Sequence, residues 1–173
     1  VYSPALTDFI MMVEDTSYMF VTGPNVVKTV THEEVSSEEL GGASTHSSKS
    51  GVAHFSCTNE VTLIEDLKIL LSYIPQNCEE DAPMLPYPIS NEHRKNLNNI
   101  IPENPNQPYD IKEVINEITD KDSFFEVHKN YAENIVCGFA RIAGKSIGIV
   151  ANQPAFLAGV LNIEASVKGA RFV

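Results

Sequence analysis

Proline constrains this chain more than any other residue, because it is concentrated in one segment. Seven of the ten prolines lie between residues 75 and 108, among many Asn, Asp and Glu residues. Proline lacks a backbone N–H and fixes its own φ, so long helices and central strands are excluded from such a segment. The pattern predicts an extended, irregular connection, with a domain boundary near residues 90–110.

Helices are predicted on both sides of this connection. Apolar residues recur at helical spacing over residues 61–74 and 111–118, and Asp110 stands where it would cap the second of these helices. Residues 162–173 have a helical pattern as well. Ser36 and Glu39 have the spacing of a capping box, which predicts a short helix ending at Gly41.

Strands are predicted in two places. The β-rich run Tyr18–Val21 has the composition of a buried strand, and the runs IVCGFARI (135–142) and SIGIVAN (146–152) flank an Ala143-Gly144 turn. The second pattern is typical of a β-hairpin. Mixed α and β elements in both halves favour an α/β or α+β layered fold.

Composition argues against several kinds of partner. A net charge of −11 and a pI near 4.8 argue against nucleic acid and against anionic membrane surfaces. No apolar run approaches the roughly 20 residues that a membrane-spanning helix needs. Three widely spaced cysteines suit a reducing compartment, and they form no CxxC metal pair. Because the chain opens without Met or a presequence, we expect it to be an excerpt from a longer polypeptide.

The stretch ELGGASTHSSKSGVAH (39–54) is expected to be a loop, rich in glycine and small residues that allow backbone to approach a neighbour closely. Its two histidines, His46 and His54, are candidates for a metal site or a general base. Their spacing is not that of one helix face and no third ligand type is nearby, so structural histidines are favoured. Its serines lack the GxSxG setting of a nucleophile.

The second half offers other polar candidates. Cys137 lies in an apolar strand and is expected to be an inert buried thiol. Lys145 at the hairpin tip either faces solvent or contacts a phosphate. Asn152 and Gln153 follow a strand end, where their amides either bond the loop itself or meet a ligand. The residues show no complete catalytic constellation, which leaves glycine-rich backbone whose N–H groups could stabilise negative charge.

Several segments together resemble one family. VYSPALTDFIMMVEDTSYMFVTGPNVVKTVT, EELGGASTHSSKSGVAH, LLSYIPQN, NYAENIVCGFARIAGKSIGIVANQP and GVLNIEASVKGARFV are similar to the carboxyltransferase (β) subunit of biotin-dependent acyl-CoA carboxylases. Within that family these segments are most similar to the propionyl-CoA carboxylase branch, with its methylmalonyl-CoA decarboxylase and transcarboxylase relatives. The resemblance runs nearly end to end and is weak only at about 79–107.

The resemblance implies a fold and an assembly. Such subunits belong to the ClpP/crotonase-like superfamily and carry two tandem α/β crotonase domains. Residues 1–90 would be the C-terminal part of the first domain, 91–110 the Pro-rich connection, and 111–173 the start of the second domain. Six such chains form a homohexamer, with each site formed by domains of two subunits.

The resemblance also implies where ligands lie. Two oxyanion holes of backbone N–H groups carry catalysis in this family, but their glycine segments would lie outside these 173 residues. No catalytic residue is therefore assigned in this chain, and the isolated segment is expected to be inactive. The substrate or biotin pocket would include Gly41, Gly42, Gly51 and Val52. The acyl-CoA or biotin-binding region would include Lys145, Asn152, Gln153 and Gly159.

The implied activity is carboxyl transfer from carboxybiotin to propionyl-CoA, giving methylmalonyl-CoA. Biotin would be carried on a biotin carboxylase/biotin carboxyl carrier α subunit, with no metal bound by this chain. Two alternatives stay open: a methylmalonyl-CoA decarboxylase or transcarboxylase subunit, and a non-catalytic crotonase-like scaffold. The expected location is the bacterial cytoplasm, or the mitochondrial matrix in a eukaryote.

Overall fold

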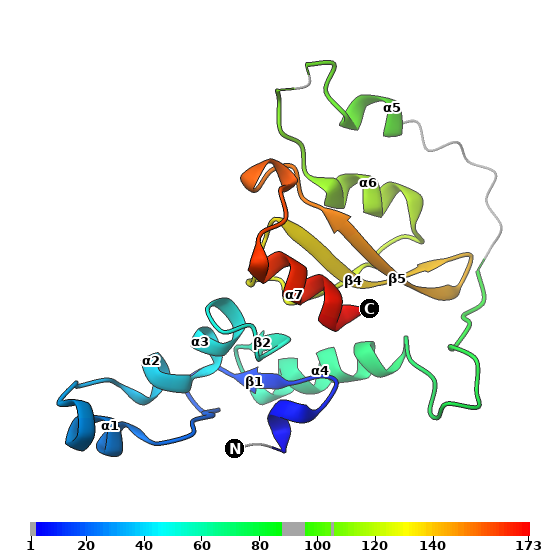
Figure 1. The fold of residues 1–173 in the computed structure, drawn as a ribbon. Coiled ribbons are helices and arrows are strands. Elements are labelled where there is room, and N and C mark those ends of the chain that lie inside the picture. The colour runs from blue at the N-terminus through cyan, green and yellow to red at the C-terminus, as the bar shows by residue number, and fades with distance from the viewer. Residues whose placement is uncertain (1–2, 88–95, 105) are drawn as a thin grey trace. The chain divides into compact units, whose positions relative to one another are not determined.

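The computed structural model describes residues 3–87, 96–104 and 106–173, which belong to two compact units (Figure 1). The first unit comprises Val1–Leu67 with His128–Tyr131, and the second comprises Lys68–Val127 with Ala132–Val173. Part of the predicted connection, residues 91–95 and 105, lies outside the described residues. The predicted domain boundary at 91–110 stays a prediction, because these units are defined by contacts within this chain alone.

The first unit is built on a two-stranded parallel sheet. Strand β1 (Met11–Val13) pairs with β2 (Phe55–Cys57), with Met11 opposite Phe55. Its helices, in chain order, are η1 (Pro4–Leu6), α1 (Pro24–Thr31), α2 (Ser37–Gly41), α3 (Ala43–Ser48) and the start of α4 (Glu60–Leu71). Four buried residues, Ile10, Met12, Ala43 and Ala53, form the core of the unit, with Met19 and Val52 packed against it.

Two expectations for this unit need correction. The predicted strand Tyr18–Val21 is wrong, because only an isolated bridge joins Tyr18 to Gly42 there. The stretch 39–54 is also not a loop, since most of it lies in α2 and α3. The capping box of Ser36 and Glu39 is confirmed, and hydrogen bonds from Ser36 lower the pKa of the Glu39 carboxyl.

Gly42 separates these two helices. It is the N-cap of α3 and has no side chain to cap that helix. The Glu38 carboxylate takes over this role, because its Oε1 accepts hydrogen bonds from the Ser44 amide at 3.1 Å and the Ser44 hydroxyl at 2.9 Å. A Cβ at position 42 would collide with that carboxylate, which explains the glycine.

The second unit is built on an antiparallel sheet ordered β3-β4-β5. Strand β3 (Phe125–Val127) pairs with β4 (Ile135–Ile142), which pairs along its whole length with β5 (Lys145–Asn152). This confirms the predicted hairpin. The remaining elements are α5 (Leu97–Ile100), α6 (Ile111–Ile118), η2 (Leu157–Gly159) and α7 (Ile163–Phe172). The helices predicted over 111–118 and 162–173 are thus confirmed, and the Asp110 carboxylate caps α6 by accepting from the Lys112 amide.

Helix α7 packs closely on β4. Ile135, Cys137 and Ala165 are buried together, with Phe172 against them. Lys168 is 1% exposed and its Nζ donates to the Ala132 carbonyl at 3.3 Å. Burial lowers the pKa of Lys168 and raises that of the Cys137 thiol to about 11. Cys137 is therefore a protonated core residue at neutral pH, which supports its interpretation as an inert thiol.

Candidate functional site

A hollow of about 370 Å³ lies in the first unit, beside the glycine-rich stretch. Its volume falls in the usual range for small-molecule sites. Most of its wall is apolar, with one hydroxyl and one imidazole, and its lining residues are Ala5, Met19, Phe20, Val21, Thr22, Leu40, His46 and Val52. Of the four predicted pocket residues, Val52 lines this hollow and Gly41 follows the lining residue Leu40 in sequence.

The glycines in this stretch are explained by neighbours within the chain. A Cβ at Gly41 would collide with the Met19 carbonyl oxygen. The Met19 amide in turn donates a hydrogen bond to the Gly41 carbonyl at 2.8 Å. Gly51 has φ of +64°, and a Cβ there would come within 2.5 Å of the Tyr131 ring. The close approach of other groups to these glycines was predicted correctly, but in the structure the approaching groups belong to the protein itself.

Both histidines of the stretch form hydrogen bonds with backbone groups. The His46 ring lies between the Met19 carbonyl oxygen, 2.8 Å from Nε2, and the Ser50 hydroxyl, 2.8 Å from Nδ1. His54 is 5% exposed, and its Nδ1 accepts from the Ile10 amide at 3.0 Å. Both arrangements support the structural interpretation. Among the described residues, no group of three His, Cys, Asp or Glu side chains is placed to hold a metal ion.

The residues predicted in the second unit divide into two places. Lys145 is exposed at the start of β5, where its backbone also bridges to Met84. Asn152 ends the same strand, and its Nδ2 donates to the Gly159 carbonyl at 2.6 Å. Lys145 and Asn152 thus stand at opposite ends of one strand, whereas Asn152 and Gly159 are brought together.

Gln153 has no side-chain group directed to solvent, since it is 1% exposed. Its Oε1 accepts from the Ile111 amide at 3.1 Å, and its Nε2 donates to the Asp110 carboxylate at 2.6 Å. The amide therefore ties the end of β5 to the start of α6. Both amides of the NQP segment bond the protein itself, which was one of the two alternatives open from the sequence.

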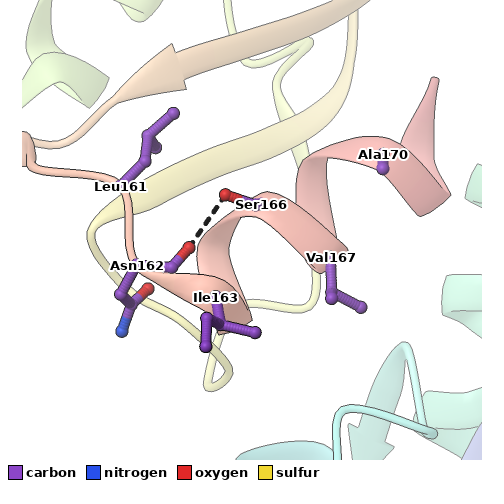
Figure 2. Close-up of a pocket in the computed structure, with 6 residues that line it drawn as sticks. All are labelled: Leu161, Asn162, Ile163, Ser166, Val167 and Ala170. Atoms are coloured by element: carbon purple, nitrogen blue, oxygen red, sulfur yellow. Dashed lines mark hydrogen bonds between the residues drawn. The ribbon is translucent and has the colours of Figure 1, made fainter.

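A second hollow, of about 540 Å³, lies on the face of α7 (Figure 2). Its residues come from the helix and the two positions before it: Leu161, Asn162, Ile163, Ser166, Val167 and Ala170. In Figure 2 the Ser166 hydroxyl donates to the Asn162 carbonyl at 2.9 Å, and Ile163 and Val167 point away from the helix axis. This hollow was not predicted from the sequence, although the i, i+4 spacing of Ile163 and Val167 indicates one apolar helix face.

The turn before this hollow has an unusual backbone. Leu157, Ala158 and Gly159 all have positive φ, at 47°, 51° and 70°. Leucine and alanine adopt this region only at a cost of about 1–2 kcal/mol each. Surrounding bonds hold the turn in place, among them the one from Asn152 to the Gly159 carbonyl.

The whole chain, residues 1–173, matches the family model described as the carboxyl transferase domain. The chain belongs to the carboxyl transferase family. It is 56% identical over its full length to the propionyl-CoA carboxylase carboxyltransferase subunit of Haloferax mediterranei, and covers 34% of that protein. It is 51% identical over its full length to the methylmalonyl-CoA decarboxylase subunit alpha of Veillonella parvula, again covering 34%. The chain thus spans about a third of the curated relatives that it matches.

Solved structures give the fold of this carboxyl transferase segment. The chain matches transcarboxylase 12S, solved as a hexamer with hydrolysed methylmalonyl-CoA bound, with a TM-score of 0.94 and 44% identity. That match covers 99% of this chain and 34% of the 12S chain. A single-chain long-chain acyl-CoA carboxylase matches with a TM-score of 0.77 at 22% identity, which supports the fold alone. The crotonase-like α/β fold expected from the resemblance is confirmed.

Among the described residues, no helix is long and apolar enough to span a membrane.

Proposed function

We propose that this chain is part of the carboxyltransferase subunit of a biotin-dependent acyl-CoA carboxylase, which transfers a carboxyl group from carboxybiotin to propionyl-CoA. The observation that carries the proposal is the family match over all 173 residues, joined to 56% identity with a propionyl-CoA carboxylase subunit. The first hollow supports it, because an apolar wall suits a short acyl group.

The partners proposed are acyl-CoA, a biotin carboxylase/biotin carboxyl carrier α subunit, and five further copies of the subunit in a homohexamer. The 12S structure, a hexamer with hydrolysed methylmalonyl-CoA bound, supports the assembly and the ligand class. A bacterial cytoplasm is the proposed location. The pocket residues Gly41, Gly42, Gly51 and Val52, and the residues Lys145, Asn152, Gln153 and Gly159, remain proposals.

Biotin would supply the carboxyl group, but the described residues do not by themselves form a cradle that fits it. At Gly41, Gly42 and Gly51 the space of a side chain is already taken by Met19, Glu38 and Tyr131. We therefore derive no reaction step through biotin, and assign to these residues only the shaping of a pocket.

The test is ATP-dependent fixation of labelled bicarbonate into methylmalonyl-CoA. A full-length subunit carrying this sequence, mixed with its biotinylated partner, should incorporate label only when propionyl-CoA, ATP and bicarbonate are all present. The isolated 173 residues should not. An inactive full-length subunit with an active partner would refute the proposed activity.

A second candidate is decarboxylation of methylmalonyl-CoA, which the 51% identity to the Veillonella parvula subunit favours. The two activities differ in direction and in partner. A subunit that releases propionyl-CoA from methylmalonyl-CoA without ATP, and that fixes no bicarbonate, would support the decarboxylase.

A further inference from the structure

The wall of the first hollow includes a segment without regular secondary structure. Residues 19–22 lie between the bridge at Tyr18 and the start of α1, and contribute Met19, Phe20, Val21 and Thr22 to the lining. Val21 is 84% exposed, so packing holds it weakly. Since no helix or strand ladder fixes this segment, its position depends on the packing of Met19 against the core and on the few hydrogen bonds that its backbone makes.

Two of those bonds hold the Met19 backbone from both sides. The Met19 amide donates to the Gly41 carbonyl at 2.8 Å, and its carbonyl oxygen lies 2.8 Å from His46 Nε2. A carbonyl oxygen only accepts, so the hydrogen between this pair is on Nε2. The imidazole therefore donates to the wall of the hollow.

Through Ser50 the same ring is linked to a second lining residue, Val52. Ser50 Oγ accepts from the Val52 amide at 3.3 Å, which leaves its hydroxyl hydrogen for His46 Nδ1 at 2.8 Å. His46, Met19 and Val52 all line the hollow. One imidazole thus joins the irregular wall at Met19 to the turn at Val52.

We propose that His46 is a positioning residue that fixes the lining of this hollow at Met19 and Val52 for the acyl-CoA substrate. The inference rests on the proposed function for the identity of the ligand. The imidazole works through backbone on both sides, and we assign it neither proton transfer nor metal binding.

Substitutions separate the two bonds. His46→Gln places an amide near the Nε2 position and keeps the donor to Met19, whereas His46→Asn reaches only the Nδ1 side and keeps the link to Ser50. His46→Ala removes both and leaves the partly buried Met19 carbonyl without its partner, which typically costs about tenfold in an equilibrium. His54→Ala is the matched control, because it removes a buried imidazole of the same unit that does not line the hollow.

The measurements use the full-length subunit with its biotinylated partner. In His46→Ala the KM for propionyl-CoA should rise about tenfold while kcat stays within about twofold. His46→Gln should restore most of the affinity and His46→Asn should not. His54→Ala should lower the melting temperature without changing this KM.

Direct binding of propionyl-CoA to the subunit, measured by calorimetry, separates the positioning role of His46 from the proposed carboxyltransferase activity. If the unsubstituted subunit binds and turns over propionyl-CoA, but all His46 variants bind it equally, the positioning role is wrong. The role is also wrong if affinity follows melting temperature across the His46 and His54 variants. If the unsubstituted subunit binds propionyl-CoA without turnover and His46→Ala weakens that binding, the proposed reaction fails while the positioning role holds. Absence of binding by the unsubstituted subunit overturns both.

Discussion

At the scale of single residues, Gly51 is a position where substitution has a clear expected cost. Its φ of +64° disfavours any side chain, and a Cβ would lie 2.5 Å from the Tyr131 ring. Gly51→Ala should therefore destabilise the protein by about 2–4 kcal/mol, combining backbone strain with overpacking. Thermal and denaturant unfolding of the full-length subunit would measure the loss.

Gly23→Ala is the control for this prediction. Nothing lies within 4 Å of a Cβ at Gly23, and its φ is −75°, so the change should cost only the difference between glycine and alanine as the N-cap of α1, about 1 kcal/mol or less. Equal losses for both variants would show that the Tyr131 contact and the positive φ carry no cost.

A second residue-scale prediction concerns the Cys137 thiol, which is fully buried. Burial raises the pKa of this thiol from 9.0 to about 11. Native protein at pH 8 should be alkylated at exposed Cys78 and not at Cys137. Because the folded state holds this proton more tightly than the unfolded state, its contribution to stability is complete below pH 9 and is lost as pH rises from 9 to about 11.

Mass spectrometry of alkylated peptides checks the reactivity of Cys137. Unfolding of the unsubstituted and Cys137→Ala proteins across this pH range checks how stability depends on pH. The unsubstituted protein should lose more stability than the variant between pH 9 and 11. Rapid labelling of Cys137 at pH 8 in folded protein would contradict its burial.

At the scale of elements, the turn of the β4–β5 hairpin depends on one carboxylate from outside the hairpin. Asp120 accepts from the Ala143 amide at 2.9 Å and the Gly144 amide at 2.7 Å. Both turn residues have positive φ, as a type I′ hairpin turn requires. Asp120→Ala should cost about 2–3 kcal/mol by leaving these amides unpaired, and Asp120→Asn about half as much.

Amide hydrogen exchange at Gly144 and Ala143 measures this effect locally. Exchange there should accelerate in Asp120→Ala, while the amides at the far end of the hairpin, near Ile135 and Asn152, should change less. Uniform acceleration across both strands would mean that Asp120 stabilises the unit in general and not the turn.

The β4–β5 hairpin shows which structural features could be predicted from the sequence and which could not. Residues 135–152 have two apolar, β-rich runs joined by the turn residues of a hairpin, and these local signals were sufficient. The link from Asp120 joins residues more than twenty positions apart, so no local pattern carries it. Strands β1, β2 and β3 were missed because each has three residues, too few to show a period. The run Tyr18–Val21 is apolar because it borders the first hollow, not because it is a strand.

The candidate site was predicted less fully for a similar reason. Close approach at Gly41 and Gly51 follows from glycine itself, but the sequence does not say whether protein or ligand approaches. Likewise, the amides of Asn152 and Gln153 were recognisable as unusual at a strand end, whereas their partners Gly159 and Asp110 depend on tertiary structure.

At the scale of the whole molecule, the apolar face around α7 predicts association of the chain when it is expressed alone. Ile163 is 79% exposed and Val167 54%, beside the exposed residues Leu157, Val160 and Leu161. Contiguous apolar surface of this kind favours contact with another surface over contact with water. Sedimentation velocity should therefore show a concentration-dependent shift from monomer to larger species.

Replacing both Ile163 and Val167 with Ser should weaken this association at least about tenfold, because burial of each side chain contributes roughly 1.5 kcal/mol or more. Leu6→Ser is the control, since Leu6 is 84% exposed but belongs to the other unit and lines neither hollow. It should leave the association constant unchanged. A monodisperse monomer at all concentrations would refute the prediction. Equal weakening by the control would mean that exposed apolar area in general, and not the α7 face, causes the association.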